Sequence, residues 1–332
     1  MTTMTKAELI EALTMPYAAF QSTFVPRATE ILREHGNRLY AMAMLGYTNV
    51  CKNQCLYCGM RAGNKIPRYR IPPEDIVQTA EYAKTLGYER LFLVAGEDPA
   101  YGIDVMVSLV RKIADMGIRL SLAGGEYPLD GYKKLRDAGL AEYVLKFEMS
   151  HPDTFNRLNP STDHARRMAG IHAVQEAGLP LASGNIVAYP GQTIDELADD
   201  ILLMTSLAIS WAPVIPYLPA KGAPLGGERG DITLCHREIT LLRLLLPDCR
   251  LTAQLPGYDL TGGLSDDLGN RLALEAGADI LFADLLPDAR AKQFSVVDNR
   301  TVLGLPHIRQ WRRRPDERYG CPARIKENSI KS

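Results

Sequence analysis

The sequence predicts a single (β/α)8 barrel of the TIM type, preceded by N-terminal helices. Three observations support this prediction. Short apolar runs of strand length alternate with longer runs whose apolar residues recur at helical spacing. Several of the longer runs end in glycine, which readily adopts the left-handed conformation of a helix C-cap. With 332 residues, of which 46% are hydrophobic, the chain can bury one large core, so we expect one domain.

The N-terminal part of the chain precedes this alternation. Residues 6–35 read as two helices, because apolar positions such as Leu9 and Leu13 lie at helical spacing. We expect these helices to cover one end of the barrel. The predicted parts of the domain are a helical cover at 1–37, the barrel at 38–290 and a C-terminal extension at 291–332.

The alternation itself consists of eight units, and eight strand-helix units predict a closed barrel. The predicted strands are 39–46, 90–95, 118–123, 142–147, 181–187, 211–216, 250–255 and 279–284. The predicted helices are 73–86, 103–116, 129–138, 163–177, 193–207, 233–245 and 265–276. The glycines at helix ends are Gly87, Gly117, Gly139, Gly178 and Gly277.

Charge and hydropathy exclude two classes of partner. The formal net charge is −1, so the chain lacks the basic surplus of a nucleic-acid-binding protein. Residues 1–6 lack the apolar core of a signal peptide, and the apolar run at 241–246 is short and interrupted by Arg243. We therefore expect a cytoplasmic protein that contacts neither nucleic acid nor membrane.

Three cysteines stand within eight residues, as Cys51-Lys-Asn-Gln-Cys55-Leu-Tyr-Cys58. Three thiols cannot all pair as disulfides, and so short a loop can turn its sulfurs onto one metal centre. A 4Fe-4S cluster held by three thiolates keeps one iron free to bind a small molecule. A structural zinc is the alternative, but it would need a fourth protein ligand, and no Cys or His near Cys58 supplies one.

The remaining cysteines are scattered along the chain at Cys235, Cys249 and Cys321. Free cysteines are commonly core residues, so we interpret these three as buried or incidental thiols. Whether any of them binds a second metal is left open by the sequence.

The spacing Cys51-x3-Cys55-x2-Cys58, with Tyr57 before the last cysteine, resembles the signature of the radical S-adenosylmethionine (SAM) enzymes. In that family SAM binds the fourth iron, and one electron cleaves it to a 5′-deoxyadenosyl radical. The chain resembles most closely the group that contains biotin synthase, the FeFe-hydrogenase maturase HydE and the methylornithine synthase PylB. Further segments that support this resemblance are 68–70, 96–99, 190–195 and 275–279.

The loops after later strands are where a barrel of this type places its site. Gly96 and Glu97 follow the second predicted strand and resemble the segment that approaches the methionine amino group of SAM. Glu126 follows two glycines after the third strand. Lys146 and Glu148 share one face by alternation, and their charges are costly inside a barrel unless they bind a ligand or each other.

An arginine near the mouth can hold a carboxylate through two parallel hydrogen bonds. The resemblance implies that Arg167 holds the SAM carboxylate, that Glu148 contacts SAM and that Tyr57 lies near the adenine. We interpret Arg166 as a surface charge. Asn185, near the end of the fifth predicted strand, is a candidate contact to the adenine or ribose.

The substrate end departs from the relatives that the sequence resembles. The maturase has arginine where Lys146 stands, and a pair of threonines in the segment Ala253-Gln254. Lys146 and Gln254 are the candidate catalytic residues. The resemblance implies a radical SAM enzyme that acts on a small amino-acid-like substrate and receives electrons from a reductant such as ferredoxin or flavodoxin. The alternative is a non-catalytic SAM-binding or iron-sulfur scaffold protein.

Overall fold

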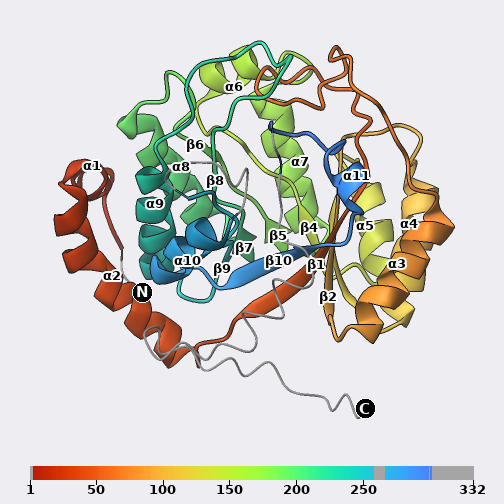
Figure 1. Ribbon diagram of the computed structural model, residues 1–332, viewed down its shortest axis with the longest axis horizontal. Coiled ribbons are helices and arrows are strands. Elements are labelled where there is room, and N and C mark those ends of the chain that lie inside the picture. The colour runs from red at the N-terminus through yellow and green to blue at the C-terminus, as the bar shows by residue number, and fades with distance from the viewer. Residues whose placement is uncertain (1–2, 258–265, 299, 301–332) are drawn as a thin grey trace.

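The structure is a computed structural model of the chain, and it describes residues 3–257, 266–298 and 300. Strands surround a central interior and helices lie outside them, as in a TIM-type barrel (Figure 1). This arrangement confirms the predicted fold class. Cys321 and most of the predicted C-terminal extension lie outside the described residues. Among the described residues, no helix has the length and apolar character that crossing a bilayer requires.

Eight parallel strands form the wall in the order β10-β1-β2-β3-β4-β5-β7-β9. The edge strands β9 and β10 are joined by two further hydrogen bonds, from Ala253 N to Ile280 O at 2.8 Å and from Asp279 N to Leu251 O at 2.9 Å. These bonds close the wall into a barrel. The strands are β1 (Tyr40–Thr48), β2 (Arg90–Ala95), β3 (Arg119–Ala123), β4 (Glu142–Val144), β5 (Leu181–Ala182), β7 (Trp211–Ala212), β9 (Arg250–Leu251) and β10 (Ile280–Asp284).

The helices of the outer layer follow the strands in turn. Those that correspond to predicted helices are α3 (Pro73–Thr85), α4 (Ile103–Asp115), α5 (Leu129–Asp137), α7 (His164–Glu176), α8 (Ile194–Ser206), α9 (Ile232–Leu245) and α10 (Asp267–Glu275). Two short helices, α6 (Pro152–Leu158) and α11 (Asp288–Ala291), have no counterpart among the predicted elements.

Both N-terminal helices are present, but their position differs from the prediction. Helix α1 (Lys6–Thr14) packs against α8, and α2 (Tyr17–Glu34) packs against α9, on the outer side of the helical layer (Figure 1). Arg237 on α9 donates to the carbonyl oxygens of Ala12 at 2.9 Å and Met15 at 2.7 Å, where the end of α1 leaves carbonyls unpaired. The helices therefore extend the helical layer beside α8 and α9 and do not cover an end of the barrel.

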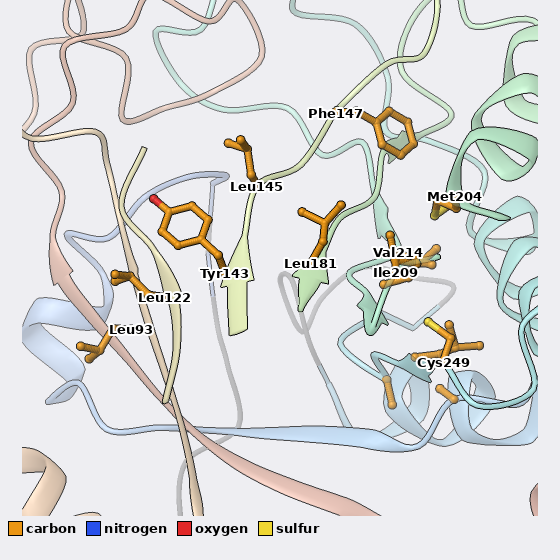
Figure 2. Close-up of a cluster of buried hydrophobic side chains, with 14 of the residues drawn as sticks. Leu93, Leu122, Tyr143, Leu145, Phe147, Leu181, Met204, Ile209, Val214 and Cys249 are labelled. Atoms are coloured by element: carbon orange, nitrogen blue, oxygen red, sulfur yellow. The ribbon is translucent and has the colours of Figure 1, made fainter. Parts of the chain in front are cut away.

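Two apolar layers follow from the alternation of side chains along each strand. Outward-facing residues such as Leu93, Leu122 and Leu181 fill the space between strands and helices (Figure 2). Inward-facing Phe92, Trp211 and Phe282 pack against one another across the barrel, with ring centroids 5.4–6.1 Å apart. Each such buried side chain contributes roughly 1.5–3 kcal/mol.

The end of the barrel where the strands begin is filled by one charged network. Glu142 lies inside this end and accepts hydrogen bonds from Arg250 Nη2 at 2.6 Å and from Ser121 Oγ at 2.6 Å. The guanidinium groups of Arg90 and Arg250 lie over the ring of Tyr40. In the part of the chain that the structure describes, this network fills the end of the barrel, and a small molecule would reach the interior from the opposite mouth.

Two predicted strands are broken in the structure. Segment 181–187 divides into β5 and β6 (Ile186–Val187), and segment 211–216 divides into β7 and β8 (Ile215–Pro216). The two breaks lie side by side, since a Cβ on Gly184 would lie 2.8 Å from Pro213 O. Proline has no N–H and cannot donate a hydrogen bond to a neighbouring strand. Beyond the breaks, β6 and β8 pair as a separate two-stranded sheet. The predicted strand 142–147 ends at Val144.

Candidate functional site

The three cysteines lie on the loop that follows β1, at the mouth formed by the C-terminal ends of the strands (Figure 1). Three segments from elsewhere in the chain fasten this cysteine loop through backbone hydrogen bonds. The loop therefore has a fixed shape that depends on the rest of the fold. These bonds, each 2.9 Å between N and O, run from Lys52 to Glu97, from Leu56 to Leu158 and from Gly59 to Val296.

Arg68 stabilises the loop from within. Its Nη1 donates to Asn49 O at 2.6 Å and to Met60 O at 2.8 Å, and its Nη2 donates to Arg61 O at 2.7 Å and to Asn64 O at 3.0 Å. These carbonyl oxygens flank the cysteines on both sides. One guanidinium thus supplies the hydrogen bonds that an irregular loop cannot make by itself. The sequence contains no local signal for this role.

The thiols of Cys51, Cys55 and Cys58 are free and partly buried. Burial raises the pKa of Cys55 to about 12, with a smaller contribution from neighbouring Cys51. Burial likewise raises the pKa of Cys58. Thiols that resist ionisation in this way become good ligands only when a cationic metal centre replaces their protons.

The donor set fits an iron-sulfur cluster better than a zinc ion. In the part of the chain that the structure describes, no three His, Cys, Asp or Glu side chains converge on a single-ion site. A structural zinc would require such convergence with four ligands. Three free thiols on one loop match a cluster that keeps one iron for a small ligand.

Gly96 and Glu97 both serve the cysteine loop. A Cβ on Gly96 would lie 2.8 Å from Cys51 Cβ and would clash with the carbonyl of Val50, so only glycine permits this approach. Glu97 accepts from Asn53 Nδ2 at 2.8 Å and forms an ion pair with Lys52 at 2.5 Å. The cofactor contacts predicted for Gly96 and Glu97 stay predictions.

Glu126 and Arg167 form the buried ion pair of the site. Arg167 Nε lies 2.7 Å from Glu126 Oε1, and Arg167 Nη1 donates to Lys146 O at 2.6 Å. The guanidinium also lies 5.4 Å from the ring centroid of Phe155. Arg166 pairs with the same carboxylate at 3.2 Å, but its side chain is 63% exposed, consistent with a surface charge. Glu126 therefore orients Arg167 at the mouth.

Lys146 and Glu148 pair with each other at the end of β4. Lys146 Nζ lies 2.9 Å from Glu148 Oε2, and each side chain is 17% exposed. Glu148 has φ of 65°, a left-handed conformation that costs a non-glycine residue roughly 1–2 kcal/mol. The conformation bends the chain so that Glu148 N donates to Gly184 O at 3.1 Å and Glu148 O accepts from Ile186 N at 3.0 Å.

The amide of Asn185 contacts two carboxylates of the helical layer, and its predicted contact with the adenine or ribose stays a prediction. Its side chain is fully buried, and its Nδ2 donates to Asp200 Oδ2 at 3.1 Å and to Glu238 Oε2 at 3.3 Å. These carboxylates belong to α8 and α9, so the amide nitrogen points into the helical layer. The backbone of Asn185 forms a parallel bridge with the backbone of Glu148. This bridge connects Asn185 to the site.

Tyr57 is oriented by a residue that sequence reasoning missed. Its hydroxyl donates to Asn159 Oδ1 at 2.7 Å, and its ring packs with Phe155 and Leu158 of α6. Asn159 follows directly after α6, the short helix absent from the predicted elements. Its only sequence signal was the Asn-Arg-Leu-Asn-Pro run at 156–160, which lacks periodicity.

Gln254 faces the barrel interior, and two of the remaining cysteines lie in the core. Gln254 follows β9, continues the inward-facing positions of Arg250 and Thr252, and is 8% exposed. Cys235 and Cys249 are buried among apolar residues of the core. This burial agrees with their interpretation as core thiols.

Comparison with known proteins identifies the family. Residues 45–204 match the family model described as the Radical SAM superfamily. The [FeFe] hydrogenase maturase subunit HydE of Thermotoga maritima is 34% identical over 286 residues, which cover 85% of this chain and 81% of that protein. The 3-methylornithine synthase of Methanosarcina acetivorans is 28% identical over 265 residues, covering 78% of this chain and 73% of that protein.

Solved structures agree with these sequence relatives. The crystal structure of methylornithine synthase (PylB) superposes with a TM-score of 0.77 and 26% identity, covering 86% of this chain and 84% of that one. A HydG maturase structure shares the fold with a TM-score of 0.73 at 21% identity, covering 90% of this chain and 69% of that one. With its cysteine loop at the barrel mouth, the chain belongs to the radical SAM superfamily, whose enzymes use a 4Fe-4S cluster and SAM.

Proposed function

We propose that this radical SAM enzyme acts on a small amino-acid-like substrate inside the barrel, in the manner of a HydE-like maturase or a methylornithine synthase. The observation that supports this proposal best is the position of Lys146 and Glu148. This ion pair lies at the same mouth as the cysteine loop, above an interior that is closed at its other end. When bound, the cluster supplies the electron that cleaves SAM to a 5′-deoxyadenosyl radical.

The role of the protein's own residues would be to hold and orient the cluster and SAM. Cys51, Cys55 and Cys58 would ligate three irons, and Arg167, fixed by Glu126, would hold the carboxylate of SAM. Tyr57, fixed by Asn159, would lie beside the adenine. Glu142 and its partners fill the end of the barrel opposite the mouth, which limits the access of water and so protects a reactive radical from side reactions.

The experiment is anaerobic reconstitution with iron and sulfide, followed by addition of dithionite and SAM. We expect about four irons per chain and formation of 5′-deoxyadenosine. Cys55→Ala should abolish both, whereas Cys235→Ala, which removes a core thiol, serves as the matched control and should retain both. An intact cluster that yields no 5′-deoxyadenosine would contradict this proposal and favour the non-catalytic scaffold.

We further propose that an acidic one-electron carrier of the cytoplasm, such as a flavodoxin or ferredoxin, docks beside the cysteine loop. Exposed Lys65, Lys221 and Lys292 surround this loop, and Asn64 Nδ2 donates to Lys221 O at 2.8 Å, which joins two of these segments. Reduction by flavodoxin should slow with rising salt. Reversing these three charges should slow it further, while dithionite-driven cleavage stays unchanged.

A further inference from the structure

Two buried polar side chains inside the barrel carry an atom that has no hydrogen-bond partner among the described residues. They are Trp211 and Thr252, each 1% exposed, and the atoms are Trp211 Nε1 and Thr252 Oγ1. Gln254, two residues after Thr252, is 8% exposed. Buried polar groups are almost always hydrogen-bonded, so two unpaired groups that face the same interior indicate a missing ligand.

The strand register brings these residues together. Val144, Ala182, Trp211 and Arg250 are successive register partners across β4, β5, β7 and β9. Two residues further along each strand, side chains face the interior again. The next layer toward the mouth therefore contains Lys146 and Thr252, and Thr252 N is held to Ala212 O at 3.2 Å. Gln254 lies one layer higher.

Trp211 lies one layer below Lys146 and Thr252. Its ring packs edge-on against Phe92, with centroids 5.4 Å apart, and against Phe282 at 6.1 Å. These contacts join opposite sides of the barrel, so the apolar layer ends at Trp211. Its unpaired N–H belongs to the boundary between the apolar layer and the polar residues above.

The chemistry of these groups selects one class of ligand. An indole N–H can only donate, and a threonine hydroxyl and a glutamine amide can also donate. Lys146 has three N–H groups, of which one is bonded to Glu148 within the described residues. Three donors with a nearby ammonium group are complementary to a carboxylate.

We infer that Trp211 and Thr252, with Gln254 and Lys146 above them, bind a carboxylate at the non-reacting end of the substrate. Trp211 and Thr252 are then specificity-determining residues, and the reacting carbon points toward the cysteine loop. This inference rests on the proposed function, because it names which end of the substrate enters the barrel first.

The test uses the fluorescence of Trp211. The chain has two tryptophans, so Trp311→Phe makes Trp211 the sole reporter. This variant, without cluster, is titrated with L-alanine, L-leucine and L-lysine, each compared with its carboxamide. We expect a saturable change in emission for at least one acid, with binding about tenfold or more tighter than its carboxamide.

Matched variants locate the contact. In the Trp311→Phe background, Thr252→Val removes the hydroxyl at nearly constant volume and should weaken binding of the acid by about tenfold. Thr85→Val, at an exposed position on α3, should leave the affinity unchanged. Circular dichroism checks that both variants fold.

The outcomes separate this inference from the proposed function. If no acid changes the emission, or if acid and carboxamide bind equally, the carboxylate site is refuted. Cleavage of SAM by the reconstituted wild-type protein would still support the proposed function in that case. Binding of an acid without any SAM cleavage would support the carboxylate site and contradict the proposed function.

Discussion

Lys146 Nζ lies 2.9 Å from Glu148 Oε2 at the mouth of the barrel, although the two residues are separated by only one position in the chain. The left-handed backbone of Glu148 accompanies this pairing. Because each side chain is mostly buried, each charge depends on the other for compensation. Before a ligand enters, Glu148 therefore compensates the charge of Lys146.

Replacing Glu148 should weaken SAM binding. Glu148→Gln removes the charge but keeps the shape, and we expect the Kd for SAM to rise about tenfold because a charge-assisted contact is lost. Isothermal titration of the cluster-loaded protein measures this change. Glu89→Gln, an exposed substitution, is the control. Equal affinity in the two variants would remove Glu148 from the SAM site.

Arg166 and Arg167 are neighbours that share Glu126, yet their substitutions should differ. Arg167→Ala leaves a buried carboxylate with one weak partner and should lower the free energy of unfolding by about 3 kcal/mol. Arg166→Ala removes an exposed pair and should cost at most about 1 kcal/mol. Urea denaturation measures both values. Similar losses in the free energy of unfolding would mean that the two arginines stabilise Glu126 equally.

Gly96 should be required for cluster assembly. Gly96→Ala would push against Val50 and Cys51, and overpacking of this kind costs about 1–3 kcal/mol. We expect iron content after reconstitution to fall, with a matching loss of visible absorbance. Gly102→Ala is the matched control, since a Cβ there meets no atom within 4 Å. Full cluster content in Gly96→Ala would show that the loop tolerates displacement.

The buried acids behind Asn185 should make stability depend on pH. Burial raises the pKa of Asp200 to about 6, from an ordinary 3.8. The folded state therefore holds this proton more tightly than the unfolded state. The resulting contribution, about 3 kcal/mol, is present at pH below about 4 and is lost as the pH rises through about 6. Thermal unfolding between pH 4 and pH 8 should show this decline.

Glu238 should contribute in the same direction. Burial raises its pKa well above the ordinary value, and Asp200 raises it further. Glu238→Gln keeps the hydrogen bond from Asn185 and removes the ionisable group, so the variant should be more stable than the wild type at pH 8. Glu89→Gln serves again as the control. A lower melting temperature for Glu238→Gln at pH 8 would show that this carboxyl is ionised in the fold.

The parts of the fold that depend on local pattern could be predicted from the sequence. The alternation of strands and helices and the three clustered cysteines are patterns formed by residues that are close together in the chain. The break at Gly184 and Pro213 depends on contact between neighbouring strands, which no local pattern records. Because residues after such a break no longer follow the strand's alternation, the sequence pattern does not record that the Asn185 amide reaches Asp200 and Glu238 of the helical layer.

The residues that stabilise the site could not be predicted from the sequence either. Arg68 binds four carbonyl oxygens, but an arginine in a loop gives no indication of its partners. Trp211 and Thr252 read as ordinary strand residues, and only their missing hydrogen bonds distinguish them. Lys146 was predicted because a charge stands out at a strand end, and Gln254 because the resembling maturase has threonines in that segment, whereas neither signal marks an indole.

The bond from Gly59 to Val296 has a consequence for biosynthesis. Gly59 N donates to Val296 O, and Asn49 Nδ2 donates to Gln293 O at 2.8 Å, so residues near the end of the barrel brace the metal-binding loop near its beginning. A nascent chain still on the ribosome has the cysteines long before it has these braces. The loop is therefore fully braced only after residues 293–296 have been synthesised and have packed against it.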